Sequence, residues 1–449
     1  MKALSSAERD LVRSIDLERL TDDLQTLVRI RSDTGEEAAA QQELAHRMAA
    51  ARLNVVQTAA DPAELAADPD FPGMEVERTT LPIVAGHLGN PTSGGRRVMI
   101  AGHIDTVPPG DRSRWTTDPF GGDIRDGKLF GRGAADMKGG LIAGLAAVRA
   151  ISEHEAELAG QVTLLSVPSE EDGGTGMLAA IRAGYTADMA VITEPTNLDV
   201  VTVQAGAVTF RITVPGRSTH AAFRLSGVSA IEKAYVILQA LLADERRRND
   251  SESDPTMRAL RLPYPTNVGV IHGGEWSSTV PEHATMEGRY GVRIGETLAD
   301  AEKDLRTAIA TACEADEWLS EHPSVVEISG GRFASANVPI THDLPASLRQ
   351  AASDTLGRRP DFTGVPYGAD MRLLVHHGAT PTVLYGPGDA RTAHSTDEHV
   401  SLRDVAACAR TLAVWVVRMA GRDPQVDRRH PWLRVSPRTK EPLKVPKGQ

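Results

Sequence analysis

The chain has 449 residues, 41% of them hydrophobic and 24% charged, which is typical of a folded globular protein of two to three domains. Its 49 Lys and Arg against 60 Asp and Glu give a net charge of -11, which argues against a nucleic acid or an anionic membrane as its main partner. Two isolated cysteines, Cys313 and Cys408, argue against a disulfide framework and a thiolate metal site. The sequence shows no signal peptide and no membrane-spanning run, so we expect a cytoplasmic protein.

Four short apolar runs that stop abruptly at polar or glycine residues predict buried parallel strands. These runs cover residues 98–101, 162–167, 189–192 and 382–385. Helical segments at residues 139–151 and 174–183 lie between them. This alternation of strand and helix predicts an α/β fold with a doubly wound, mostly parallel sheet.

A second domain is predicted where the pattern changes at Val208, since apolar and polar residues then alternate up to Val214. The elements expected after it are a helix at 228–247, strands at 267–272 and 284–294, a helix at 298–317 and a strand at 324–329. This β-α-β-β-α-β order predicts a ferredoxin-like domain inserted into the α/β domain. We expect the polar stretch 248–265 to be a mobile linker.

The domain boundaries that follow are 1–206 and 333–421 for the two parts of the α/β domain and 207–332 for the insertion. Residues 422–449 form a basic, proline-containing tail. We expect this tail to be a solvated arm or disordered rather than a binding surface.

Possible metal ligands follow the predicted strands, at the edge where ligands bind in open α/β sheets. His103 follows the first strand, and Asp105 is placed to accept a hydrogen bond from its ring. Asp136 lies among glycines just before a helix. Each feature also has a structural interpretation, as a hydrogen-bonded histidine or as a helix N-cap.

Further acidic groups follow the later strands. Glu170, Glu171 and Asp172 are adjacent, and their mutual repulsion is costly unless a cation neutralises it, although a solvated acidic turn is the alternative. Glu194 and His394 follow two more strands. Together these groups form a nitrogen and oxygen ligand set for a divalent metal such as zinc, cobalt or manganese.

These segments, in this order and with the insertion after the fourth, resemble the M20 family of metallopeptidases and amidohydrolases, which includes acetylornithine deacetylase and succinyl-diaminopimelate desuccinylase. The resemblance covers residues 20–418. The resemblance implies two divalent metal ions bridged by Asp136. Zinc is the metal we expect, with cobalt or manganese as alternatives. The ligands so implied are His103 and Glu194 for one ion, and Glu171 and His394 for the other.

The resemblance also implies the acid–base residues. Asp105 would be the hydrogen-bond partner of His103. Glu170 would be the general base that deprotonates the attacking water and then protonates the leaving nitrogen. In the insertion, His220 matches a family motif whose histidine contacts the oxyanion, in many members from the partner subunit. A homodimer joined through the insertion is therefore expected, with His220 acting either across subunits or within its own.

The chain departs from the family where many members have the asparagine and arginine that hold a substrate carboxylate. Ser278 and Arg289-Tyr290-Gly291 occupy those positions. Arg289 or Arg293 could take the place of the missing arginine, or both could simply face solvent.

We therefore expect a hydrolase that cleaves an amide C–N bond in a small N-acyl compound, of the N-acyl amino acid deacylase type. The alternatives are a dipeptidase or carboxypeptidase, and a deformylase or aminohydrolase acting on a cyclic substrate. A non-catalytic metal-binding protein is disfavoured because Glu170 is needed for turnover and not for metal ligation.

Overall fold

The computed structural model describes residues 4–421, which form two compact units. The first unit contains the described residues up to 202, residues 337–363 and those from 370 on, and the second contains residues 203–336 and 364–369. The predicted tail at 422–449 lies outside the described residues. No helix within residues 4–421 is long and apolar enough to cross a membrane.

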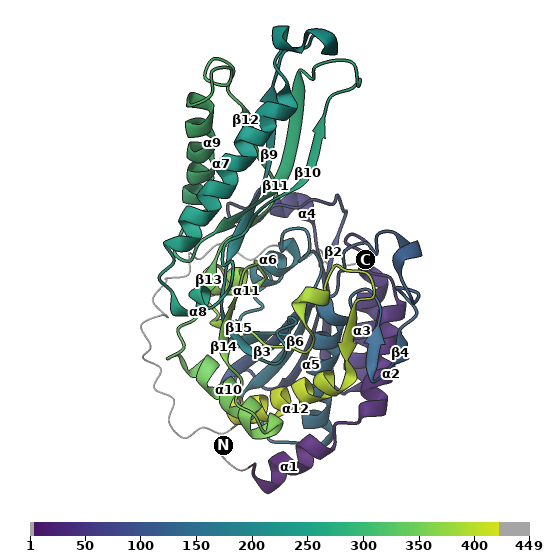
Figure 1. The fold of residues 1–449 in the computed structure, drawn as a ribbon. Helices are drawn as coiled ribbons and strands as arrows, with labels where there is room; N and C mark the ends of the chain where they lie inside the picture. Colours follow the sequence, from purple (N-terminus) through teal and green to yellow (C-terminus); the bar gives the residue numbers. More distant parts are fainter. Residues whose placement is uncertain (1–3, 422–449) are drawn as a thin grey trace. The chain divides into compact units, whose positions relative to one another are not determined.

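The first unit is built around the larger sheet (Figure 1). Its strands are β1 (Asn54–Ala60), β2 (Leu81–Gly89), β3 (Arg97–His103), β6 (Gln161–Val167), β7 (Met189–Ile192), β8 (Val200–Gln204), β13 (Ala336–Asn337), β14 (Phe362–Val365) and β15 (Thr382–Leu384). Strands β8, β13 and β14 each include residues on both sides of the unit boundary. The strand order is β1-β2-β6-β3-β7-β15-β8-β13, with β14 paired to β8. A small second sheet joins β16 (His399–Ser401), β5 (Lys128–Phe130) and β4 (Asp123–Arg125).

The centre of the larger sheet is parallel. Strands β6, β3, β7 and β15 are neighbours and run in the same direction, whereas β1, β2 and β8 pair antiparallel. The four predicted apolar runs are these four strands, so the prediction of an α/β fold with a mostly parallel sheet is confirmed. Because parallel neighbours end at the same edge, the polar residues after β3, β6, β7 and β15 meet there.

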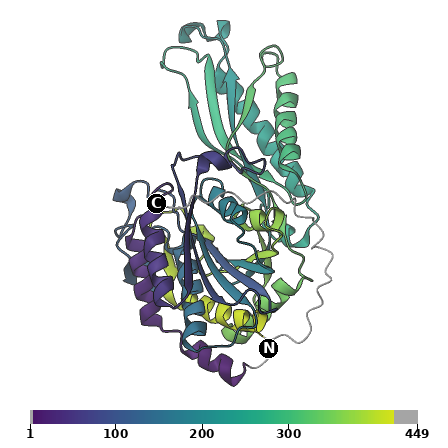
Figure 2. The same ribbon diagram turned by 180° about the vertical axis from the view of Figure 1, so that it is seen from behind.

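Helices lie on both sides of this sheet (Figures 1 and 2). The helices of the first unit are α1 (Ser6–Arg13), α2 (Leu17–Arg29), α3 (Ala38–Ala50), α4 (Pro62–Leu65), α5 (Gly139–Glu153), α6 (Thr175–Arg182), α10 (Asp343–Leu356), α11 (Met371–His376) and α12 (Leu402–Met419). Short turns lie at η1 (Arg112–Arg114), η2 (Ala134–Lys138) and η4 (Ala390–Thr392). Helix α5 packs on β3 and β6 and is covered by α12, while α6 packs on β2 and β6.

One glycine brings two of these elements together at the sheet edge. A Cβ at Gly140, in the first turn of α5, would lie 2.0 Å from the Thr193 carbonyl oxygen. Only glycine permits this close backbone approach. The start of α5 is thereby held against the end of β7, which brings Asp136 and Glu194 close to one another.

The second unit has one four-stranded antiparallel sheet in the order β10-β11-β9-β12. Its elements are β9 (Gly206–Pro215), η3 (Ala221–Ser226), α7 (Ala230–Asp250), α8 (Pro255–Arg258), β10 (Thr266–Gly273), β11 (His283–Val292), α9 (Leu298–Glu314) and β12 (Val325–Phe333). Helices α7 and α9 lie side by side over the sheet (Figure 1). This is the ferredoxin-like order of elements and strands. The alternating residues from Val208 to Val214 form the buried face of β9.

The stretch 248–265, which we predicted to be a mobile linker, is packed into the second unit. Arg248 is 1% exposed and donates to Glu296 at 2.8 Å. Met257 and Tyr264 are buried with Val203 and Ala205 in a separate apolar cluster. The prediction was wrong because charged residues that are paired in the folded protein are as polar in sequence as those of a solvated loop.

Candidate metal centre

His103, at the end of β3, is buried, and its two ring nitrogens face different groups. Nδ1 lies 2.9 Å from the backbone carbonyl oxygen of Asp105 and 3.5 Å from its carboxylate. Burial lowers the pKa of His103, but hydrogen bonds to Asp105 and Asp136 outweigh it and raise that pKa well above its usual range, so the metal-free ring also donates from Nε2. Loss of that proton leaves Nε2 with a lone pair for a metal. The carbonyl of Asp105, rather than the carboxylate that we expected, is thus the closer partner that orients this ring.

Asp136 lies between two histidines. Its Oδ1 is 3.2 Å from His103 Nε2, and its Oδ2 is 3.4 Å from His394 Nε2. The two histidines follow β3 and the loop after β15, so the sheet edge brings them to opposite oxygens of one carboxylate. A carboxylate placed in this way can bridge two cations.

Two further carboxylates complete the cluster, one beside each histidine. Glu171 lies 3.0 Å from His394 Nε2, and Glu194 Oε1 lies 3.8 Å from His103 Nε2. Ligand atoms of His103, Asp136 and Glu171 all lie within 4.8 Å of one another. The structure therefore brings together all five residues that the sequence analysis assigned as metal ligands.

Several carboxylates are buried close together in this cluster, and their pKa values are shifted accordingly. Burial, with Asp136 nearby, raises the pKa of Glu171, and for the same reasons the pKa of Glu194 lies well above its usual range. Burial would also raise the pKa of Asp136, but hydrogen bonds from His103 and His394 outweigh it and hold that pKa low. Glu194 Oε1 is buried without a hydrogen-bond partner among the described residues. A divalent cation such as zinc would neutralise the buried carboxylates, and imidazole and carboxylate groups are suitable ligands for it.

The loop after β6 carries Glu170 and Glu171 and is fixed through its backbone. The N–H groups of Glu170 and Glu171 donate to Asp105 Oδ1 and Oδ2, at 3.2 and 3.1 Å. The Asp105 carboxylate therefore holds the acidic loop close to His103. Burial, with the carboxylates of Asp370 and Glu171 nearby, raises the pKa of Glu170 well above its usual range.

Glu398 supports the cluster and was not singled out by the sequence analysis. Its Oε1 accepts from the N–H groups of Ala135 and Asp136, at 2.9 and 3.1 Å. Its Oε2 accepts from Arg132 at 2.5 Å, and it is 1% exposed. No local sequence signal marks it, because it looks like one more acid in a polar loop after His394.

Access to the cluster differs between its two sides. The side chain of His103 is 1% exposed, whereas that of His394 is 52% exposed. A substrate would therefore approach from the side of His394.

His220 lies in the second unit, just before η3. It is exposed, and its Nδ1 accepts a hydrogen bond from the N–H of Ala222 at 3.1 Å. An accepting Nδ1 places the hydrogen of the neutral ring on Nε2. Nε2–H is then free to donate to a ligand.

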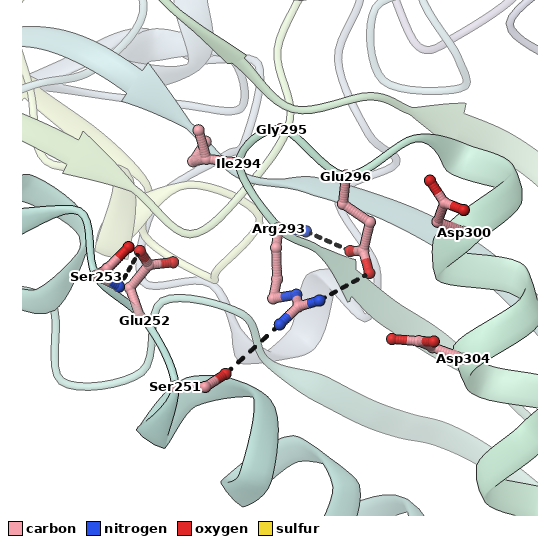
Figure 3. A pocket seen from close by; sticks show the side chains of 9 residues that line it. All are labelled: Ser251, Glu252, Ser253, Arg293, Ile294, Gly295, Glu296, Asp300 and Asp304. Carbon is pink, nitrogen blue, oxygen red and sulfur yellow. Dashed lines mark hydrogen bonds and ion pairs between the residues drawn. The ribbon is translucent and has the colours of Figure 1, made fainter.

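Neither arginine that we considered as a carboxylate ligand is free of protein contacts. Arg289, on β11, is exposed, with its guanidinium carbon 5.2 Å from the centre of the Phe333 ring. Arg293 pairs with Glu296 at 3.6 Å and contacts Ser251 at 3.5 Å, inside a cavity of about 370 Å³ in the second unit (Figure 3). Acidic side chains line much of this cavity, and the positive charge of Arg293 offsets part of their negative charge.

Comparison with known proteins identifies the family of this chain. Peptidase family M20/M25/M40 matches residues 99–418. The chain belongs to the M20 peptidase family. Among M20 relatives, acetylornithine deacetylase from Edwardsiella ictaluri is 31% identical over 77% of this chain and 86% of its own length. The N-formyl-4-amino-5-aminomethyl-2-methylpyrimidine deformylase of Halalkalibacterium halodurans is 27% identical over 74% of this chain and 82% of its own length.

A solved structure supports the same fold for this M20 chain. Human carnosine dipeptidase 1 matches with a TM-score of 0.69 and 19% identity, covering 93% of this chain and 99% of that one. The family match over residues 99–418 confirms the sequence-based identification of the M20 family. The protein is an M20 hydrolase.

Proposed function

We propose that this chain is a dinuclear metal-dependent hydrolase that cleaves an amide C–N bond in a small N-acyl compound. The observation that carries the proposal is the position of Asp136, whose two carboxylate oxygens each face a different histidine, at 3.2 and 3.4 Å. His103 and Glu194 would hold one ion, and Glu171 and His394 the other. Zinc suits these donors best, with cobalt or manganese as alternatives.

Bound metal ions would supply Lewis acidity, lowering the pKa of water and stabilising negative charge on the carbonyl oxygen. Glu170 would accept a proton from the attacking water and return it to the leaving nitrogen as the C–N bond breaks. Water adds across that bond, so the products are a carboxylic acid and an amine. Asp105 would keep Glu170 in place through the hydrogen bond from the Glu170 N–H.

His220 would donate a hydrogen bond from Nε2 to the developing oxyanion. The hydrogen bond from Ala222 to Nδ1 supports this role because it leaves the proton on Nε2. We assign His220 a catalytic role whether it acts across subunits or within its own.

Two observations bear on the acyl group and the amine of the substrate. The relatives are named for removal of acetyl and formyl groups, which favours a deacylase. Arg289 and Arg293 each make contacts within the protein, which favours a substrate without the usual carboxylate. An N-formyl cyclic compound is therefore the second candidate substrate. A dipeptidase or carboxypeptidase activity is the third.

We further propose a homodimer joined through the second unit. Strand β10 is an edge strand of its sheet, and its Val270 and Ile271 side chains are 43% and 55% exposed. An exposed apolar edge strand of this kind favours pairing with a second copy. The two buried, unpaired cysteines are compatible with our assignment to the cytoplasm.

Metal analysis combined with a substrate panel tests the proposal. The purified protein should hold two divalent ions per chain, lose activity on chelation and regain it with zinc, cobalt or manganese. It should hydrolyse at least one member of a panel of N-acyl amino acids, N-formyl heterocycles and dipeptides. Hydrolysis that persists after the metal has been removed, or a dimetal protein inert towards the whole panel, would contradict the proposal.

A further inference from the structure

A segment without regular secondary structure, residues 72–80, contacts the loop that carries Glu170 and Glu171. The Gly73 carbonyl accepts from Thr175 Oγ1 at 3.0 Å, and the Val76 N–H donates to Asp172 Oδ2 at 3.1 Å. A Cβ at Gly173 would lie 2.2 Å from the Gly73 oxygen, so the two backbones meet closely. We call residues 72–80 the anchor segment.

Arg78 is the buried side chain that fixes the anchor segment. Its Nη1 lies 2.6 Å from Glu37 Oε1, and its Nη2 lies 2.9 Å from Asp172 Oδ2. The side chains of Arg78 and Glu37 are each 2% exposed and that of Asp172 is 4% exposed. One guanidinium therefore joins the residue before α3 to the acidic loop.

Asp172 carries this connection into the backbone of the loop. Its Oδ1 accepts from Ser169 Oγ at 2.5 Å. Ser169 has φ 68°, a conformation that residues other than glycine rarely adopt, and its carbonyl accepts from the Gly174 N–H at 2.6 Å. Such a conformation persists only when its surroundings hold it.

The loop is therefore held by two carboxylates. Asp105 binds the N–H groups of Glu170 and Glu171, and Asp172 fixes Ser169, the residue just before them. Arg78 comes from outside both the loop and the sheet edge, as does Arg372 of α11, which donates to the Gly173 carbonyl at 2.6 Å.

We propose that Arg78 is a positioning residue that sets the orientation of Glu170, the proposed general base. This inference rests on the proposed function. Without the guanidinium, Asp172 and Glu37 are two buried carboxylates that lack this cationic partner. Asp172 then loses the ion pair that fixes its orientation, which loosens its hold on Ser169 and lets Glu170 leave its catalytic position.

Three variants test the kinetic part of this inference. Arg78→Met removes the charge, and Arg78→Lys keeps the charge but lacks the planar fork that spans two carboxylates. Arg149→Met is the matched control, because Arg149 makes a buried ion pair with Asp23 at 2.7 Å in the same unit. We expect Arg78→Met to lower kcat at least tenfold with KM and metal content unchanged, Arg78→Lys to recover part of it, and Arg149→Met to keep kcat.

A double-variant cycle separates positioning from a general loss of stability. In a Glu170→Gln background the base is already absent, so Arg78→Met should lower the rate little further. Non-additivity of this kind marks two residues that act through one step. An equal fold-loss in both backgrounds would overturn the proposal.

Hydrogen exchange of the metal-loaded protein provides a readout that does not depend on activity. We expect peptides covering residues 168–176 to exchange faster in Arg78→Met than in the wild type or in Arg149→Met. If Arg78→Met does not fold, Asp172→Asn serves instead, since it removes the same ion pair at constant size. Wild-type exchange in the folded variant would overturn the role of Arg78, whereas faster exchange in a protein that hydrolyses nothing would contradict only the proposed function.

Discussion

The carboxylate of Glu398 accepts a hydrogen bond of 3.1 Å from the backbone N–H of Asp136, although 262 residues separate the two in the sequence. Asp136 is the group that faces both histidines, so its backbone position determines whether both metal positions can form. Glu398 also binds Arg132, which ties the loop of Asp136 to the loop of His394.

We expect Glu398→Ala to weaken metal binding about 10- to 100-fold, the usual effect of removing a group that orients a metal ligand. Metal affinity would be measured by competition with a chromogenic chelator. Asp23→Ala is the control, since it also removes a buried carboxylate paired with an arginine in the first unit. Equal affinities for Glu398→Ala and the wild type would show that Asp136 does not depend on this contact.

Asp136→Ala should disrupt both metal positions, whereas His394→Ala should mainly weaken one. The reason is that the two proposed ligand sets share only Asp136. Metal per chain would be counted by mass spectrometry after dialysis against limiting chelator. An Asp136→Ala protein that still holds two equivalents would refute the bridging assignment.

Glu170→Gln should keep two metal ions per chain and lose on the order of 10²–10⁴ in rate, the usual contribution of general acid–base catalysis. The glutamine keeps the size of the side chain but cannot accept the proton. Steady-state kinetics and metal analysis on the same preparation check both parts. Near-normal turnover would remove Glu170 from the mechanism.

His220→Ala should lower turnover by roughly 10²–10³ with metal content intact, because a donor to the oxyanion acts only as charge develops. If His220 acts across subunits, mixing His220→Ala chains with Glu170→Gln chains should restore activity, since one site of each mixed dimer then holds both groups. Mixed dimers would be verified with two affinity tags.

Two other outcomes would change the role that we assign to His220. Full activity of His220→Ala would remove it from catalysis. Verified mixed dimers that remain inactive would instead assign His220 to the active site of its own subunit.

Metal binding should release protons, and its affinity should rise with pH. In the metal-free protein burial lowers the pKa of His394, but hydrogen bonds to Asp136 and Glu171 outweigh this and raise it to about 11. His394 is therefore protonated at pH 7 to 9, and the proton must leave before the ring can bind a metal. Calorimetry in buffers of different protonation enthalpy would count the protons. His394→Ala should release at least one fewer proton per chain, and an unchanged count would contradict this role.

The sequence alone determined which segments form the centre of the sheet. Runs such as 162–167 are apolar throughout because both faces of a central parallel strand are buried, and this signal is local. The same pattern located His103, Glu171 and Glu194 at strand ends, where parallel neighbours bring them to one edge. The strand-end pattern therefore predicted that these groups lie together, whereas the resemblance to the M20 family assigned the five proposed ligands.

The tertiary structure alone decided what holds those ligands in place. His103 Nδ1 lies 2.9 Å from the carbonyl of Asp105 and 3.5 Å from its carboxylate, a difference that no residue pattern encodes. The burial of Arg248 depends on its pairing with Glu296, and the contacts of Glu398 with Asp136 and of Arg78 with Asp172 join residues far apart in the chain. Periodicity reports which face of an element is buried, whereas these contacts depend on how distant elements pack against one another.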